Sequence, residues 1–100
     1  MDAMRILVVE DEKKVASFIK KGLQQEGYAA DAVHDGMEAV RNATAFDYDL
    51  VILDLMLPKQ PGLEVLREIR SKKPKLPVLI LTAKGAIEDK VAGLDAGGEL

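Results

Sequence analysis

The sequence contains no cysteine, no tryptophan and a single histidine, His34, among its 100 residues. Without cysteine, the chain cannot form disulfides, use a thiolate nucleophile or hold zinc or an iron–sulfur cluster on cysteine ligands. A single histidine also excludes a metal site built from several histidines. No apolar run approaches the ~20 residues that span a bilayer, and no signal-peptide pattern opens the chain. We therefore expect a soluble, cytoplasmic domain that makes no contact with a membrane.

Positive charge is scarcer than negative charge. The 14 lysine and arginine residues are outnumbered by 17 aspartate and glutamate residues, which gives a net charge of −3. Domains that bind nucleic acid usually present a basic stripe, so we expect no direct contact of this chain with nucleic acid. Apolar residues make up 48% of the chain and charged residues 31%, a mixture that is typical of one globular domain.

Short apolar segments alternate with segments of helical periodicity along the chain. The apolar segments predict strands at residues 5–10, 28–33, 50–53 and 78–81, and the periodic segments predict helices at 13–26, 37–45, 63–73 and near 87–94. A βα unit repeated four times requires parallel strands joined by right-handed helical crossovers. The sequence therefore predicts an α/β fold with a parallel sheet.

Polar side chains stand where three of these strands end. Glu10 and Asp11 follow the first strand, Asp54 follows the third and Thr82 follows the fourth. Open α/β sheets bind ligands at the carboxyl ends of their strands. If the first and third strands are neighbours, three carboxylates converge and repel one another unless a hard cation such as Mg²⁺ lies among them. Asp54 is then the expected nucleophile toward a phosphoryl group, with the Thr82 hydroxyl bonded to a phosphoryl oxygen. The alternative is that these acids cap helices or lie solvated in loops.

Several motifs that span nearly the whole chain carry a family resemblance. They are RILVVEDE at 5–12, HDG at 34–36, DLVILDLMLP at 49–58, PGLEVL at 61–66, LILTA at 79–83 and VAGLDAG at 91–97. Together they resemble the receiver domain of bacterial two-component response regulators, above all receivers that precede a winged-helix DNA-binding domain. The resemblance implies an incomplete flavodoxin-like (CheY-like) fold, a doubly wound parallel sheet of four βα units with strand order 2-1-3-4.

The resemblance also implies a role for individual residues. Asp54 would accept a phosphoryl group from a sensor histidine kinase or a small phosphodonor. Mg²⁺ would be bound directly by Asp11 and Asp54, through water by Glu10, and by the backbone carbonyl of Met56. His34 is expected to lie exposed, outside the phosphotransfer chemistry. A domain of this kind is a signalling domain rather than an enzyme, although it promotes its own phosphorylation and dephosphorylation, and it normally controls a C-terminal DNA-binding effector.

The family pattern continues beyond the last residue of this chain. A fifth strand, whose lysine pairs with the phosphoryl group, and a fifth helix would follow Leu100. We therefore expect residues 1–100 to form a receiver domain that lacks both elements and is impaired in phosphorylation. We also expect it to self-associate through the exposed edge of the fourth strand, Val78 to Leu81, and through an uncovered face of the first helix.

Two other functions stay open. One is a Mg²⁺-dependent phosphohydrolase that also uses an aspartate nucleophile. Hydrolases of the haloacid dehalogenase type usually carry a second acid two positions after the nucleophile, where Met56 stands here. The other is a structural or interaction fragment that is not phosphorylated.

Overall fold

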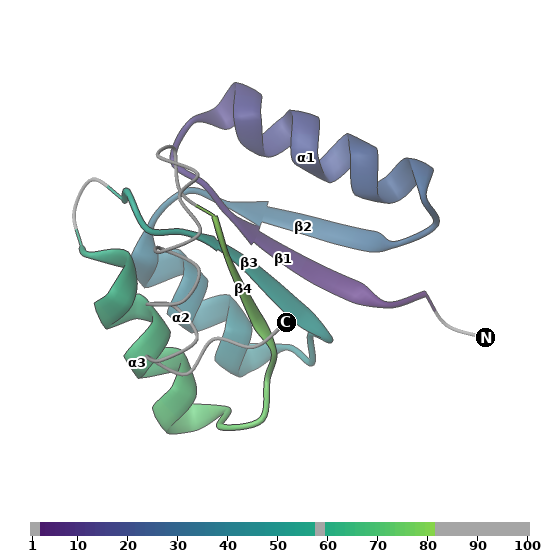
Figure 1. Cartoon of the computed structure of the whole chain (residues 1–100). Helices are drawn as coiled ribbons and strands as arrows, with labels where there is room; N and C mark the ends of the chain where they lie inside the picture. Colours follow the sequence, from purple (N-terminus) through teal and green to yellow (C-terminus); the bar gives the residue numbers. More distant parts are fainter. Residues whose placement is uncertain (1–2, 58–59, 82–100) are drawn as a thin grey trace.

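The computed structural model describes residues 3–57 and 60–81 of the chain (Figure 1). Four strands and three helices alternate along this part of the chain: β1 (Arg5–Val9), α1 (Lys13–Gln25), β2 (Ala29–Val33), α2 (Gly36–Ala45), β3 (Leu50–Asp54), α3 (Gly62–Lys72) and β4 (Val78–Leu81). These bounds differ from the predicted ones by no more than one residue at any end. Thr82 and the predicted fourth helix lie outside the described residues.

All four described strands belong to one parallel sheet, in the order β2-β1-β3-β4. This order confirms the 2-1-3-4 arrangement that the family resemblance implied. The chain passes from β1 outward to β2 and then returns across β1 to β3, so the strand order reverses between β1 and β3. Such a switch point opens a crevice at the carboxyl ends of the two strands, which here is the end where Val9 pairs with Leu53.

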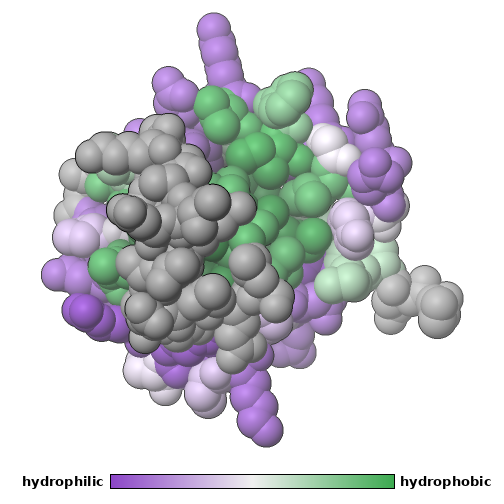
Figure 2. All heavy atoms as spheres, viewed as in Figure 1, coloured by the Kyte–Doolittle hydropathy of each residue, from purple (hydrophilic) through white to green (hydrophobic). Residues whose placement is uncertain are grey.

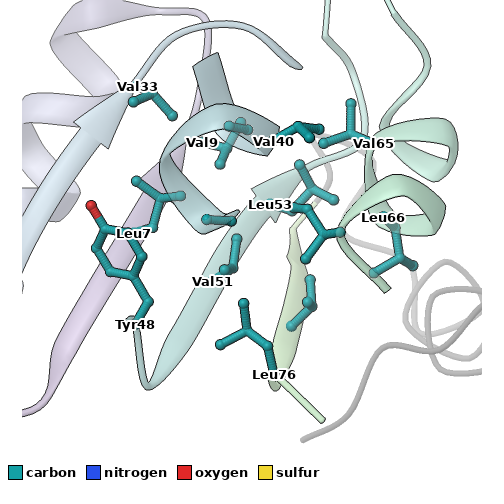
Figure 3. Packing of buried hydrophobic residues seen from close by; sticks show 14 of the residues in the cluster. Leu7, Val9, Val33, Val40, Tyr48, Val51, Leu53, Val65, Leu66 and Leu76 are labelled. Atoms are coloured by element: carbon teal, nitrogen blue, oxygen red, sulfur yellow. The ribbon is translucent and has the colours of Figure 1, made fainter. Parts of the chain in front are cut away.

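Helices cover the sheet on both faces, with α1 on one side and α2 and α3 on the other (Figure 1). The side facing α2 and α3 holds the main core (Figure 3), whose most deeply buried large side chains are Leu7, Val9, Val51, Leu53, Val65, Leu66, Ile69 and Val78. Alternate residues of the same strands, among them Ile6 and Val8, are buried on the α1 side. Burial on both faces explains why β1 is apolar without interruption, as parallel strands usually are.

Local signals in the sequence set the ends of two helices. Gly27 follows α1 with a φ of 93°, a left-handed conformation that glycine adopts without a steric penalty. Asp35 precedes α2, and its carboxylate accepts a hydrogen bond from the backbone N–H of Glu38, which makes it the N-cap of that helix. In the described part of the chain, no helix combines the length and the apolar character needed to cross a membrane.

Candidate functional site

Three acidic side chains meet at the carboxyl ends of β1 and β3. Carboxylate oxygens of Glu10, Asp11 and Asp54 all lie within 4.8 Å of one another. The parallel register explains the meeting, because Val9 pairs with Leu53 and the residue after each of them is an acid, Glu10 and Asp54. The structure thus brings these three carboxylates together, as the sequence predicted.

The crowding of these acids changes how Glu10 binds its proton. Partial burial raises the pKa of Glu10 from its ordinary value of 4.5 to about 7, and hydrogen bonding to Asp11 and Asp54 and the negative charge of Asp54 act in the same direction. A hydrogen bond from the backbone N–H of Glu12 to Glu10 Oε2, 2.8 Å long, opposes this rise. Burial and the neighbouring acids thus both disfavour the charged form of Glu10.

No salt bridge between described residues involves these three acids. The two salt bridges within residues 3–57 and 60–81 join Arg5 to Asp31 and Lys73 to Asp47, away from the acidic site. Carboxylate oxygens are the ligands that Mg²⁺ prefers, and a site open to solvent suits an ion that keeps several waters. The donor set thus fits a hard divalent cation held by Asp11, Asp54 and Glu10.

Asp54 is held in place by the turn that follows β3. Its Oδ1 accepts a hydrogen bond from the backbone N–H of Met56 at 3.0 Å. The next segment folds back so that the N–H of Gly62 donates to the carbonyl of Leu55 at 3.2 Å. A Cβ at Gly62 would lie 2.5 Å from the Cα of Leu55, so this close approach requires glycine at the start of α3. The backbone around the proposed nucleophile is therefore tightly packed on one side.

The structure leaves two of the predicted site residues untested. The side chain of Met56 is 58% exposed, and the predicted use of its carbonyl as a metal ligand stays a prediction. The hydroxyl of Thr82 lies outside the described residues, so its predicted contact with a phosphoryl group also stays a prediction.

One residue near the site was interpreted wrongly from the sequence. His34 was expected to lie exposed in a loop, but it is partly buried, and its Nδ1 lies 3.0 Å from the carbonyl oxygen of Glu10. The available signal was its position directly after β2, which places it at the same edge of the sheet as Glu10. A bond between a side chain and a backbone carbonyl leaves no pattern in the sequence, so nothing indicated the contact itself.

The sequence matches the response regulator receiver domain over residues 6–99. It is 46% identical, over 99 residues, to the transcriptional regulatory protein TcrA of Mycobacterium tuberculosis, covering 99% of this chain and 39% of that protein. It is 43% identical, over 96 residues, to the transcriptional regulatory protein CusR of Escherichia coli, covering 96% of this chain and 42% of that protein. The chain thus spans about two-fifths of the length of these curated relatives.

Solved structures agree with these relatives. The receiver domain of the Francisella response regulator 1452 superimposes with a TM-score of 0.87 at 33% identity, covering 96% of this chain and 79% of that one. The response regulator TrrA of Thermotoga maritima, solved in complex with Mg²⁺-BeF, superimposes with a TM-score of 0.83 at 41% identity, covering 91% of this chain and 79% of that one. The predicted CheY-like flavodoxin fold is therefore confirmed. With a family match over nearly its whole length, the chain belongs to the response regulator receiver domains of two-component signalling.

Proposed function

We propose that this domain accepts a phosphoryl group on Asp54 in a Mg²⁺-dependent reaction, with a sensor histidine kinase or a small phosphodonor as the source. The observation that carries the proposal is the convergence of three carboxylates within 4.8 Å, none of which forms a salt bridge with a described residue. The names of the relatives support control of transcription by a longer protein, other parts of which would make the contact with DNA. We place this protein in the cytoplasm, where such a regulator acts.

In this proposal each group of the site has a task. The N–H of Met56 donates a hydrogen bond to Oδ1 of Asp54. The other carboxylate oxygen, Oδ2, does not take part in that bond and is the atom that attacks phosphorus. The Oδ2–P bond forms as the bond from phosphorus to the donor atom breaks, and the leaving group departs with that electron pair and takes up a proton. Bound Mg²⁺ would neutralise negative charge on the transferring oxygens. Asp11 and Asp54 would hold it directly, the Met56 carbonyl would add a ligand and Glu10 would act through water, while Thr82 would bond a phosphoryl oxygen.

Phosphorylation with acetyl phosphate tests this function directly. After incubation with Mg²⁺ and acetyl phosphate, the intact mass should increase by one phosphoryl group, and the increase should be absent in Asp54→Asn and after chelation of Mg²⁺. Asp47→Asn is a matched control, because it removes an exposed carboxylate at the opposite end of β3 and should leave the increase unchanged.

The same assay separates the competing functions. Continuous release of phosphate from an organic phosphate, with no adduct accumulating, would support a phosphohydrolase with an aspartate nucleophile. No modification and no turnover under any of these conditions would leave an interaction fragment and refute the proposal.

We also propose that copies of this chain associate through the outer face of α1 and the edge strand β4. Phe18 on α1 is 79% exposed and Val15 is 36% exposed, while Leu81 on β4 is 37% exposed. Figure 2 shows apolar atoms gathered near the middle of the viewed face, and exposed apolar surface of this kind favours association. Analytical ultracentrifugation at micromolar concentration should show a dimer that Phe18→Ser weakens, and a monomer at every concentration would refute it.

A further inference from the structure

His34 contacts the acidic site through its ring rather than through its backbone. Nδ1 of the partly buried imidazole lies 3.0 Å from the carbonyl oxygen of Glu10. A carbonyl oxygen can only accept a hydrogen bond, so Nδ1 carries the proton and donates it. The contact therefore requires the tautomer, or the charged form, in which Nδ1 is protonated.

The backbone of Glu10 is held at both of its polar groups. Its N–H donates to the carbonyl of Val33 at 3.1 Å, and its own carbonyl accepts from His34. These two bonds continue the contact between β1 and β2 one residue beyond the last ladder pair, Val9 with Val33. Because a peptide unit is planar, fixing the Glu10 carbonyl fixes the plane that joins the Cα atoms of Glu10 and Asp11. Two of the three carboxylates of the site branch from those two atoms.

The loop that carries His34 is itself anchored to α2. The N–H of His34 lies 3.4 Å from Oε1 of Glu38, and the N–H of Glu38 donates to Oδ1 of Asp35 at 2.8 Å. The Asp35 side chain thus caps a donor in the first turn of the helix, while the Glu38 side chain reaches back to the residue before the N-cap. Helix α2 packs on the core through Ala39 and Ala43, both fully buried. A rigid connection thus runs from the core through His34 to the Glu10–Asp11 peptide.

We propose that His34 is a positioning residue for the acidic site. By donating from Nδ1 to the Glu10 carbonyl, it sets the orientation of the peptide between Glu10 and Asp11, and with it the arrangement of carboxylates presented to a divalent cation. This inference rests on the proposed function in that the cation is Mg²⁺. The role depends on hydrogen-bond geometry, so it requires a donor at this position and not an imidazole as such.

Two substitutions of nearly equal shape separate the hydrogen bond from the volume of the side chain. His34→Asn keeps an N–H donor close to the place of Nδ1, whereas His34→Leu fills similar space without a donor. Isothermal titration calorimetry with Mg²⁺ should give His34→Asn a dissociation constant within about twofold of that of the unmodified protein. His34→Leu should bind Mg²⁺ about tenfold more weakly. Loss of a residue that orients a metal ligand weakens binding by about 10- to 100-fold, and we expect the lower end of that range.

A matched control removes one hydrogen bond at the other end of the sheet. Tyr48 Oη donates to Asp31 Oδ2 at 2.7 Å, and Tyr48→Phe deletes that bond while leaving the Mg²⁺ affinity unchanged. A second measurement does not involve the metal. In the metal-free protein, ¹⁵N spectra of the imidazole should show a proton on Nδ1.

The outcomes distinguish this inference from the proposed function. If the unmodified protein binds Mg²⁺ and His34→Leu binds it as tightly as His34→Asn, the positioning role is refuted while the proposed function stands. A proton on Nε2 instead of Nδ1 refutes the positioning role in the same way. Failure of the unmodified protein to bind Mg²⁺ overturns the proposed function, and the inference with it.

Discussion

Replacing Asp54 by asparagine should stabilise the metal-free protein, although it removes the proposed phosphoacceptor. Asp54 contributes, through a hydrogen bond and through its charge, to the rise in the pKa of Glu10 to about 7. Asp54→Asn keeps the shape of the side chain and removes the charge. Glu10 and Asp11 then no longer face a negative charge at position 54, so the folded state gains free energy relative to the unfolded chain, in which residue 54 is far from residues 10 and 11.

The direction of the pH dependence follows from proton binding. Since the pKa of Glu10 is raised from 4.5 to about 7 in the folded protein, the folded state binds more protons than the unfolded state between these values. The free energy of unfolding of the metal-free protein must therefore fall as the pH rises from about 4.5 to about 7, and then level off.

The size of this loss is limited by solvent. A shift of this size would correspond to about 3 kcal/mol for a fully buried group, but Glu10 is partly exposed, and solvent screening reduces the figure to about 1 kcal/mol. Burial is the largest cause of the shift, so removing the Asp54 charge restores only part of it. We expect Asp54→Asn to be more stable than the unmodified protein by about 0.5 kcal/mol at pH 8, and by much less at pH 5.

Urea unfolding measures this difference, followed by circular dichroism because the chain has no tryptophan. Both proteins are compared at about pH 5 and pH 8 in a chelator, with Asp47→Asn as the control for loss of an exposed carboxylate. Excess Mg²⁺ at about 100 times its dissociation constant should stabilise the unmodified protein by about 2.7 kcal/mol and Asp54→Asn by much less. If Asp54→Asn is less stable than the unmodified protein at pH 8 without metal, the charge of Asp54 does not destabilise the folded state by repelling Glu10 and Asp11.

Two further predictions concern the packing of the chain. Gly62→Ala should destabilise the domain by about 2 kcal/mol or more, because the added Cβ would lie 2.5 Å from the Cα of Leu55. Gly22→Ala should instead stabilise α1 by up to about 1 kcal/mol, because no atom lies within 4 Å of its added Cβ. Thermal unfolding measures both, and equal effects at the two glycines would contradict the close approach. Burial and the hydrogen bond to Asp31 raise the pKa of Tyr48 to about 12, so an ultraviolet titration should show an ionisation near that pH that Tyr48→Phe removes. Since the raised pKa favours the neutral phenol in the folded state, the domain should lose stability as the pH rises from 10 to about 12.

The elements of the fold were predictable because each carries its own local signal. Strand β3 is four apolar residues closed by an acid, and α2 begins one residue after the N-cap Asp35. The order of the strands was not predictable from such signals. Nothing in the composition of β1 or β3 says that they are neighbours, and this came only from the family resemblance.

The first helix shows where periodicity stops being informative. Its apolar spacing places Val15, Ile19 and Leu23 on one face of the helix. In the structure Ala16 is the buried residue of α1, and Phe18 is among the most exposed apolar side chains of the described residues. Periodicity indicates which residues share a face of a helix, but it does not indicate how much of that face another element covers.

The electrostatics of the acidic site also impose an order on the proposed reaction. A phosphodonor approaches with negative charge of its own, and it meets a site in which burial and neighbouring carboxylates already raise the pKa of Glu10 to about 7. A second anion entering first would increase this repulsion, whereas a cation entering first removes it and releases the proton from Glu10. Under the proposed function, Mg²⁺ therefore binds before the phosphodonor. Raising the pH from about 6 to about 8 should strengthen Mg²⁺ binding, since less of Glu10 must then lose its proton, and an affinity that is unchanged over this range would show that Glu10 takes no part in holding the ion.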